Sequence, residues 1–87
     1  MDFETAVKTV VQLTGAPTNE EKLKIYGLYK QSTVGDVNTP TPSFFDFAGN
    51  AKWKSWNEYK GKTQDQAKQE YTDFVTSLVT KYGVISA

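Results

Sequence analysis

Two segments of four residues, TNEE at residues 18–21 and TQDQ at residues 63–66, have the pattern of a capping box. In this motif the hydroxyl of the first residue accepts a hydrogen bond from the backbone N–H three residues later, and the Glu or Gln at that position bonds back to the first backbone N–H. The pattern marks the first turn of a helix. A chain that starts a helix at two such places is constrained toward helical structure.

The spacing of the apolar residues extends both boxes into helices and predicts two more. Behind the second box, apolar side chains recur at steps of three and four as far as Gly83, a residue suited to end a helix. The first box opens a helix that we predict to end near Gly35. The same steps over residues 3–13 and 48–59 predict a first and a third helix. No alternating strand pattern competes, so the sequence predicts one all-α domain over residues 1–87, a small four-helix bundle.

One long connection is expected between the second and third helices. Residues 35–47, GDVNTPTPSFFDF, hold two prolines, small polar residues and three phenylalanines. A connection of this length is longer than most helix–helix loops, and long ordered loops often carry function. We predict that Phe44, Phe45 and Phe47 hold the loop against the body of the protein, because phenylalanine prefers interiors. Direct contact of these rings with a ligand is the less favoured alternative.

The composition excludes several classes of function. The 87 residues include no cysteine and no histidine, which removes the usual metal ligands, nucleophiles and general bases. We therefore expect neither a metal site nor an enzyme. Ten basic residues balance ten acidic ones, so no global electrostatic field favours nucleic acid or an anionic membrane. Any site for an anion must be local.

The beginning of the sequence does not resemble a secretion signal. Asp2 and Glu4 stand where such a signal carries positive charge, and the longest apolar run is far shorter than a membrane span. The lack of cysteines suits a reducing compartment. We therefore expect a cytoplasmic protein that does not insert stably into membranes. Since nothing in the sequence demands self-association, we expect a monomer.

Tyrosine is the informative aromatic residue of this chain, because a buried hydroxyl needs water or a partner. Tyr26, Tyr29 and Lys30 have the spacing of one helical face, so a lysine would emerge beside two phenol edges. For each tyrosine alone, a boundary position with the hydroxyl at the surface is the more frequent situation. The three residues together favour a surface that holds a ligand.

A second local signal is the segment 51–62, AKWKSWNEYKGK, which carries four lysines against one glutamate. Lys52 lies next to Trp53 and four residues before Trp56, so it can stand at the rim of a surface that those rings cover. We interpret the other three lysines as a solvated face: Lys54, Lys60 and Lys62. Two lysines from two helices can meet one phosphate, and a tyrosine can stack on a base. Such residues fit a ligand that bears a nucleotide.

Three segments together resemble the acyl-coenzyme A-binding protein (ACBP) family: YGLYKQSTVGD at residues 26–36, FDFAGNAKWKSWNEYKGK at 45–62 and EYTDFVTSLVTKYG at 70–83. The likeness extends over nearly the whole chain. It implies an up-down-down-up four-helix bundle with a long loop between the second and third helices. It also implies a protein that binds long-chain fatty acyl-CoA esters non-covalently, without hydrolysing them, as an intracellular carrier and pool former. No cofactor is implied.

The resemblance further implies a ligand site of five residues. Tyr26, Lys30 and Lys52 would meet the ribose 3′-phosphate of CoA. Tyr29 would stack with the adenine, Tyr71 would add contacts to the ligand, and an apolar groove would hold the acyl chain. No catalytic residue is implied.

This sequence departs from many members of the family in its charge. Four positions where those proteins carry lysine are uncharged here: Val11, Ala16, Ala48 and Asn50. We expect this difference to weaken the secondary electrostatic attraction of the ligand, which affects affinity and chain-length preference more than function.

Two other functions remain open at this point. The tyrosines, together with Trp53 or Trp56, have the composition of a partner-binding patch in a helical interaction module. A thioesterase is less favoured, because no arrangement of base and nucleophile is visible in the sequence.

Overall fold

The computed structural model describes residues 1–85 and places four helices in them: α1 (Phe3–Val10), α2 (Asn19–Thr33), α3 (Phe47–Asn57) and α4 (Gln64–Tyr82). The only β-type pairing in the described part is a single isolated bridge. The predicted all-α class is confirmed. Ser86 and Ala87 lie outside the described residues, so a single domain over the whole of residues 1–87 stays a prediction.

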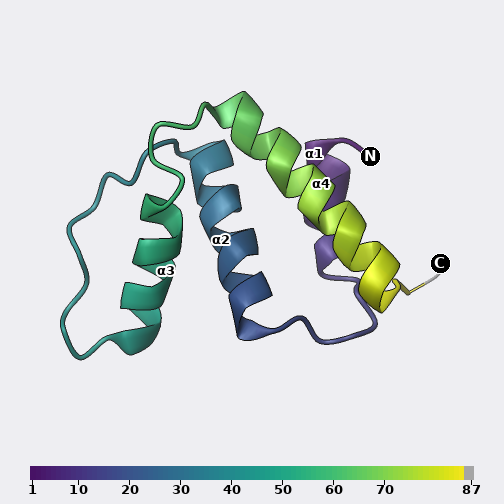
Figure 1. Cartoon of the computed structure of the whole chain (residues 1–87), viewed down its shortest axis with the longest axis horizontal. Helices are drawn as coiled ribbons and strands as arrows, with labels where there is room; N and C mark the ends of the chain where they lie inside the picture. The colour runs from purple at the N-terminus through teal and green to yellow at the C-terminus, as the bar shows by residue number, and fades with distance from the viewer. Residues whose placement is uncertain (86–87) are drawn as a thin grey trace.

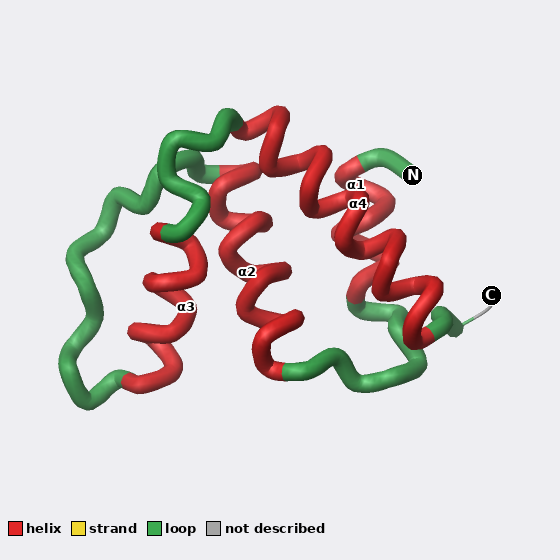
Figure 2. The backbone as a smooth tube through the Cα atoms, in the orientation of Figure 1, coloured by secondary structure: helices red, strands yellow, loops and turns green. Residues whose placement is uncertain are grey.

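The helices form a flat molecule of 41 × 28 × 16 Å with α2 in its middle. α3 lies on one side of α2 and α4 on the other, while α1 packs against α4 (Figure 1). α2 and α3 run in the same direction, because the connection between them returns along the full length of α3 (Figure 2). α1 and α4 run the opposite way. This is the up-down-down-up order that the resemblance implies.

Both capping boxes form as predicted. The Thr18 hydroxyl accepts from the Glu21 N–H at 3.1 Å, and the Glu21 carboxylate accepts from the Thr18 N–H at 2.8 Å. Thr63 and Gln66 exchange the same two bonds at 3.1 and 3.0 Å. α4 ends at Tyr82, and the capping residue Gly83 follows with a φ of +78°, in the region that favours glycine.

α1 is shorter than predicted, because another segment binds the backbone that follows it. The helix ends at Val10, and the side chain of Val11 is 81 % exposed. Residues 12–14 pair instead with residues 83–85, through two backbone hydrogen bonds of 2.9 and 3.0 Å. A contact between segments so far apart in the chain leaves no trace in the local apolar spacing.

The other predicted helix ends differ from the structure by one or two residues. α2 ends at Thr33, and Gly35 follows with a φ of +97°, as expected of a left-handed residue. α3 starts one residue before the predicted Ala48, because the Asp46 side chain accepts from the Gly49 N–H at 2.9 Å and caps the helix there.

The core lies between α1, α2 and α4. Its buried centre consists of Ala6 from α1, Leu28 from α2, and Tyr71 and Val75 from α4. α3 is outside this centre and packs against α2 alone among the described helices. Its strongest anchor is Trp56, whose side chain is only 4 % exposed. The site described below therefore depends on how α3 fits against α2.

α3 approaches α2 closely at Gly27. A Cβ atom at this position would lie 2.6 Å from the Ser55 carbonyl oxygen and 2.9 Å from the ring of Tyr59. Both distances are shorter than van der Waals contact allows. Glycine is therefore required in the interior of α2 by the neighbouring helix, although it is an unfavourable residue for a helix.

The predicted anchoring of the long loop by phenylalanine is wrong. The side chains of Phe44, Phe45 and Phe47 are 80, 81 and 76 % exposed. None of the three belongs to the buried core or to the apolar residues packed on it.

Two tryptophans hold the loop instead. The indole N–H of Trp53 donates to the carbonyl of Thr39 at 2.9 Å, and that of Trp56 donates to the carbonyl of Gly35 at 2.8 Å. An indole combines an apolar ring with a donor, so a tryptophan of α3 can bury its ring and also satisfy a loop carbonyl. Phenylalanine cannot supply that hydrogen bond.

Candidate ligand-binding site

α2 and α3 bring together three of the five predicted residues along their common boundary. Tyr26 and Lys30 lie one turn apart on α2, and Lys52 lies on α3. The Nζ of Lys52 is 5.7 Å from the centroid of the Tyr26 ring. The Nζ of Lys30 is 4.9 Å from the centroid of the Trp56 ring. Both are cation–π distances, so each lysine stands over an aromatic face at the α2–α3 boundary.

The charges of Lys30 and Lys52 are not neutralised by carboxylates. Within residues 1–85 the ion pairs are Lys62 with Glu70 and Lys81 with Glu21. Lys30 is half-buried and Lys52 is exposed. A cation that packs on an aromatic ring without a carboxylate partner remains available to an anion. This boundary is therefore suited to phosphate, although the net charge of the chain is zero.

A hollow of about 300 Å³ opens at the same boundary, toward the N-terminal ends of α2 and α3. It is lined by Asn19, Lys22, Leu23, Ala48, Ala51 and Lys52. Leu23 and the two alanines supply an apolar wall, and the two lysines supply a cationic rim. Of these residues, the sequence predicted only Lys52 as a ligand contact, and it marked Ala48 as a position where many family members carry lysine. The hollow itself could have been predicted from Ala48 and Ala51, because two small residues three apart on α3 leave room beside α2.

The other two predicted residues, Tyr29 and Tyr71, form an aromatic cluster with Phe3 on the α1 side of α2. The Tyr29 and Tyr71 ring centroids lie 6.2 Å apart, and Phe3 lies 6.3 Å from Tyr29 and 5.1 Å from Tyr71. Tyr29 is 39 % exposed and can present its ring to a ligand. Phe3 was not predicted as part of a site. The apolar spacing over residues 3–13 marked it only as a core-facing residue of the first predicted helix.

Tyr71 belongs to the core more than to the surface. Its side chain is 2 % exposed, and burial raises the pKa of its hydroxyl to about 12. The residue supports Tyr29 and Phe3 from beneath. Any contact with a ligand is restricted to the small part of the side chain that reaches the surface.

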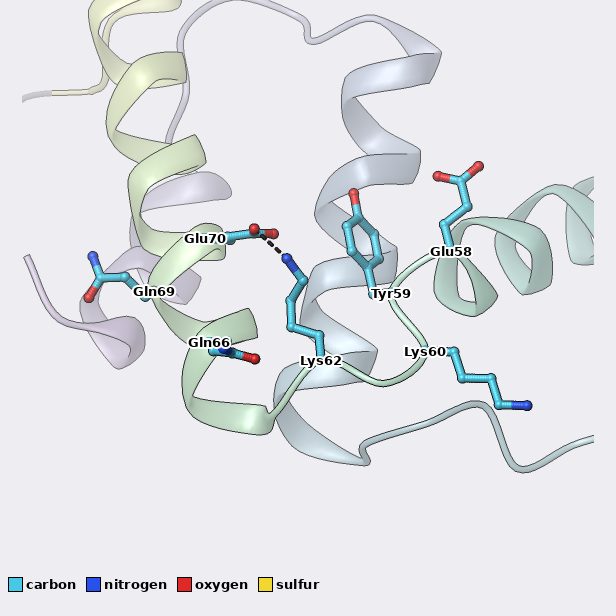
Figure 3. Close-up of a pocket in the computed structure, with 7 residues that line it drawn as sticks. All are labelled: Glu58, Tyr59, Lys60, Lys62, Gln66, Gln69 and Glu70. Carbon is cyan, nitrogen blue, oxygen red and sulfur yellow. Dashed lines mark hydrogen bonds and ion pairs between the residues drawn. The ribbon is translucent and has the colours of Figure 1, made fainter.

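A separate hollow of about 420 Å³ lies where the α3–α4 connection meets α4 (Figure 3). It is lined by Glu58, Tyr59, Lys60, Lys62, Gln66, Gln69 and Glu70. In Figure 3, Lys62 points at Glu70 and forms an ion pair with it, while Lys60 points away from both. The predicted solvated face holds for Lys54 and Lys60, which are exposed, but is wrong for half-buried Lys62. This hollow lacks an unpaired inward cation and contains none of the predicted site residues.

None of the helices in residues 1–85 is long and apolar enough to cross a membrane. This finding concerns spanning helices only.

The chain is similar to known proteins over most of its length. The family model described as "Acyl CoA binding protein" matches residues 1–75. Acyl-CoA-binding protein homolog 1 of Caenorhabditis elegans is 46 % identical over 83 residues, which are 95 % of this chain and 96 % of that protein. The acyl-CoA-binding protein homolog of Drosophila melanogaster is 46 % identical over 80 residues, 92 % of this chain and 93 % of that one.

Solved structures agree with the sequence comparison. The crystal structure of Oryza sativa acyl-CoA-binding protein 2 superposes with a TM-score of 0.87 at 37 % identity, covering 91 % of this chain and 88 % of that one. The solution structure of the yeast acyl coenzyme A binding protein gives a TM-score of 0.74 at 41 % identity, covering 93 % and 94 % of the two chains. The chain therefore belongs to the acyl-CoA-binding protein family.

Proposed function

We propose that this protein binds long-chain fatty acyl-CoA esters non-covalently and acts in the cytoplasm as their carrier and pool former. Membership of a family of binding proteins supports this proposal, as do relatives named for acyl-CoA binding. Within this chain, one observation carries it. The unneutralised Lys52 ammonium lies over the Tyr26 ring at the rim of a hollow whose wall is apolar. A phosphate and a hydrocarbon chain, joined in one ligand, match these two surfaces.

The head group is assigned to the five predicted residues. Lys30 and Lys52 would donate charge-assisted hydrogen bonds to the ribose 3′-phosphate, with the Tyr26 hydroxyl as a third donor. Tyr29 would stack with the adenine from the exposed side of the aromatic cluster. Tyr71 would hold Tyr29 in place and contribute a minor contact of its own. These roles are part of the proposal.

The acyl chain would enter the hollow between α2 and α3. Burial of a methylene group contributes up to about 0.8 kcal/mol, so ten methylenes contribute roughly 8 kcal/mol before the costs of association and ordering. The acyl chain of the ligand therefore supplies most of the binding affinity. The phosphate contacts would select CoA esters over free fatty acids.

A calorimetric titration of three ligands tests this function. Pure protein is titrated with a long-chain acyl-CoA, with CoA and with the corresponding free fatty acid. The acyl-CoA should bind much more tightly than either part, because only the whole ligand uses both surfaces. Equal weak binding by all three would rule the proposal out.

We also propose that the protein does not hydrolyse its ligand and acts as a monomer. Incubation with acyl-CoA should release no free thiol, as measured with a thiol reagent. Release of CoA at a rate proportional to protein concentration would instead indicate a thioesterase. Sedimentation equilibrium, with and without ligand, measures the mass of the complex.

A further inference from the structure

The loop between α2 and α3 contains two Thr-Pro pairs, Thr39-Pro40 and Thr41-Pro42. They are the only places in the sequence where proline follows a hydroxyl residue, since the third proline follows Ala16. Both threonines are exposed. The loop lies along the outer side of α3, at the edge of the molecule (Figure 2). The proposed ligand site uses neither threonine.

The hydroxyls of these two threonines have no partner, unlike those of many helical threonines. The hydroxyls of Thr9, Thr33 and Thr76 donate to a carbonyl one turn earlier in their own helix, at 2.7, 2.8 and 2.9 Å. Among the hydrogen bonds of residues 1–85, Thr39 takes part in one through its carbonyl, and none involves Thr41. The Thr41 hydroxyl is therefore free to react.

The backbone around Thr41 is accessible as well. The loop is held before it, where the Thr39 carbonyl accepts from the Trp53 indole, and after it, where the Ser43 carbonyl accepts from the Asn50 side chain at 2.8 Å. Between these anchors, residues 40–42 form no hydrogen bond with the described part of the chain. A residue that precedes proline is restricted to extended backbone. Thr41 thus lies in a short, extended segment on the surface.

We propose that Thr41 is phosphorylated by a proline-directed protein kinase. Such a kinase binds an extended segment and requires proline directly after the residue that it modifies. In the reaction, Oγ1 of Thr41 attacks the γ-phosphorus of ATP, and a new oxygen–phosphorus bond forms. The bond from that phosphorus to the ADP oxygen breaks, and a carboxylate of the kinase takes the hydroxyl proton. Thr39 is the poorer site, because Trp53 holds its carbonyl.

A phosphate on Thr41 would place negative charge beside the lysines of α3. Trp53, which anchors the loop, lies between Lys52 and Lys54 in the sequence of this helix. Neither lysine belongs to an ion pair within residues 1–85. A phosphothreonine carries a charge of about −1.5 to −2, so it would attract these ammonium groups and repel another phosphate. We therefore expect phosphorylation to weaken acyl-CoA binding, a consequence that rests on the proposed function.

Incubation of the full chain with a mitogen-activated protein kinase and ATP tests the site without any acyl-CoA. We expect one phosphate per molecule, located on Thr41 by tandem mass spectrometry and lost in Thr41→Ala. Pro42→Ala should abolish the modification too, although this variant keeps the hydroxyl. Thr39→Ala is the matched control and should be modified like the wild type. Circular dichroism measures whether each variant remains helical.

Two further rates test the role of the loop structure. Trp53→Phe frees the Thr39 carbonyl, so phosphate incorporation at Thr39 should increase while that at Thr41 stays the same. A synthetic peptide of residues 36–46 supplies a reference rate. Thr41 in the folded protein should react about as fast as in the peptide, because the segment needs no unfolding. Modification of the peptide alone, or equal modification of the wild type and Pro42→Ala, would overturn the proposal.

Calorimetry with acyl-CoA compares the phosphorylated and unmodified proteins. We expect about threefold weaker binding after phosphorylation at low ionic strength, and a smaller difference at high salt, because salt screens the repulsion between exposed charges. Equal affinity of the two forms at low salt would refute the coupling between Thr41 and the ligand site. Failure of both forms to bind acyl-CoA would instead refute the proposed function, while the kinase reaction at Thr41 would stand.

Discussion

The hydroxyl of Tyr82, at the end of α4, donates to the carboxylate of Glu21, which lies 61 residues earlier in the first turn of α2. The same carboxylate accepts from the ammonium of Lys81 at 3.0 Å and from the backbone N–H of Thr18. These hydrogen bonds lower the pKa of Glu21 from 4.5 to about 2, with the Tyr82 bond as the largest cause. One carboxylate thus caps α2 and joins its start to the end of α4.

The lowered pKa of Glu21 predicts that the stability of the fold depends on pH in the acid range. A group whose pKa is lower in the folded state stabilises the fold above its unfolded pKa, and this contribution is lost as the pH falls through the folded value. The free energy of unfolding should therefore decrease between about pH 4.5 and pH 2. Glu21→Gln should flatten this part of the profile, measured by urea unfolding at several pH values. Glu20→Gln, an exposed carboxylate in the same turn, is the control. An unchanged profile in Glu21→Gln would contradict the assignment.

Gly27→Ala should destabilise the protein, although alanine favours helices. The helix propensity gains roughly 1 kcal/mol, but the new Cβ meets the Ser55 backbone at 2.6 Å. Relief of that contact requires α3 to shift, so we expect a net loss of about 1–3 kcal/mol in the free energy of unfolding. Acyl-CoA affinity should fall as well, because α3 carries Lys52. Urea unfolding and titration measure the two effects, and a gain in stability would refute the close packing.

Trp56→Phe and Trp53→Phe separate the two anchors of the loop. The buried Trp56 indole loses both packing volume and its bond to Gly35, so we expect its replacement to cost about 1–3 kcal/mol of unfolding free energy. At Trp53 the Thr39 carbonyl is exposed and can accept from water, so the cost should be below about 1 kcal/mol. Chemical denaturation compares the two variants. A larger loss at Trp53 would show that the loop depends on its middle more than on its start.

Lys52→Ala and Lys30→Ala should each weaken acyl-CoA binding by about 1.5–3 kcal/mol, roughly tenfold or more, through loss of a charge-assisted bond to phosphate. Fatty acid binding should change much less. Lys54→Ala provides the matched control, because Lys54 is an exposed lysine two residues from Lys52 that does not line the α2–α3 hollow. Calorimetry with both ligands measures the selectivity. Equal effects at Lys52 and Lys54 would argue against a specific phosphate contact.

The sequence predicted the helices best where a local motif determines an end. Thr18, Thr63 and Gly83 satisfy backbone groups within a few residues of themselves, so the start of α2 and both ends of α4 follow from the sequence. The grouping of Tyr26 with Lys30 follows equally from helical spacing. Their meeting with Lys52 depends on tertiary packing, and the sequence supplied it only through resemblance to a family.

The errors at the end of α1 and in the long loop share one cause, which is contact between distant segments. Residues 12–14 leave the predicted first helix because residues 83–85 pair with them. Phenylalanine is suited to an interior, but the carbonyls of the loop need donors, and the indoles of α3 supply them. Apolar spacing reports how a helix is oriented and contains no information on which distant backbone group requires a hydrogen bond.

The attachment of α3 through α2 alone gives the molecule two parts of unequal local stability. α1, α2 and α4 enclose the core, whereas α3 and its loop lie outside it. They are held by the close contact at Gly27, the buried Trp56 ring and a small set of hydrogen bonds, which include the two indole bonds and the bond from Gln31 to the Lys62 carbonyl. Amide hydrogens of α3 should therefore exchange with deuterium faster than those of α4, through an opening that leaves the core folded. A ligand that touches both α2 and α3 would slow exchange most strongly in α3. Part of its binding energy is then spent on holding this helix in place, so the measured affinity reports the local stability of α3 as well as the contacts of the ligand.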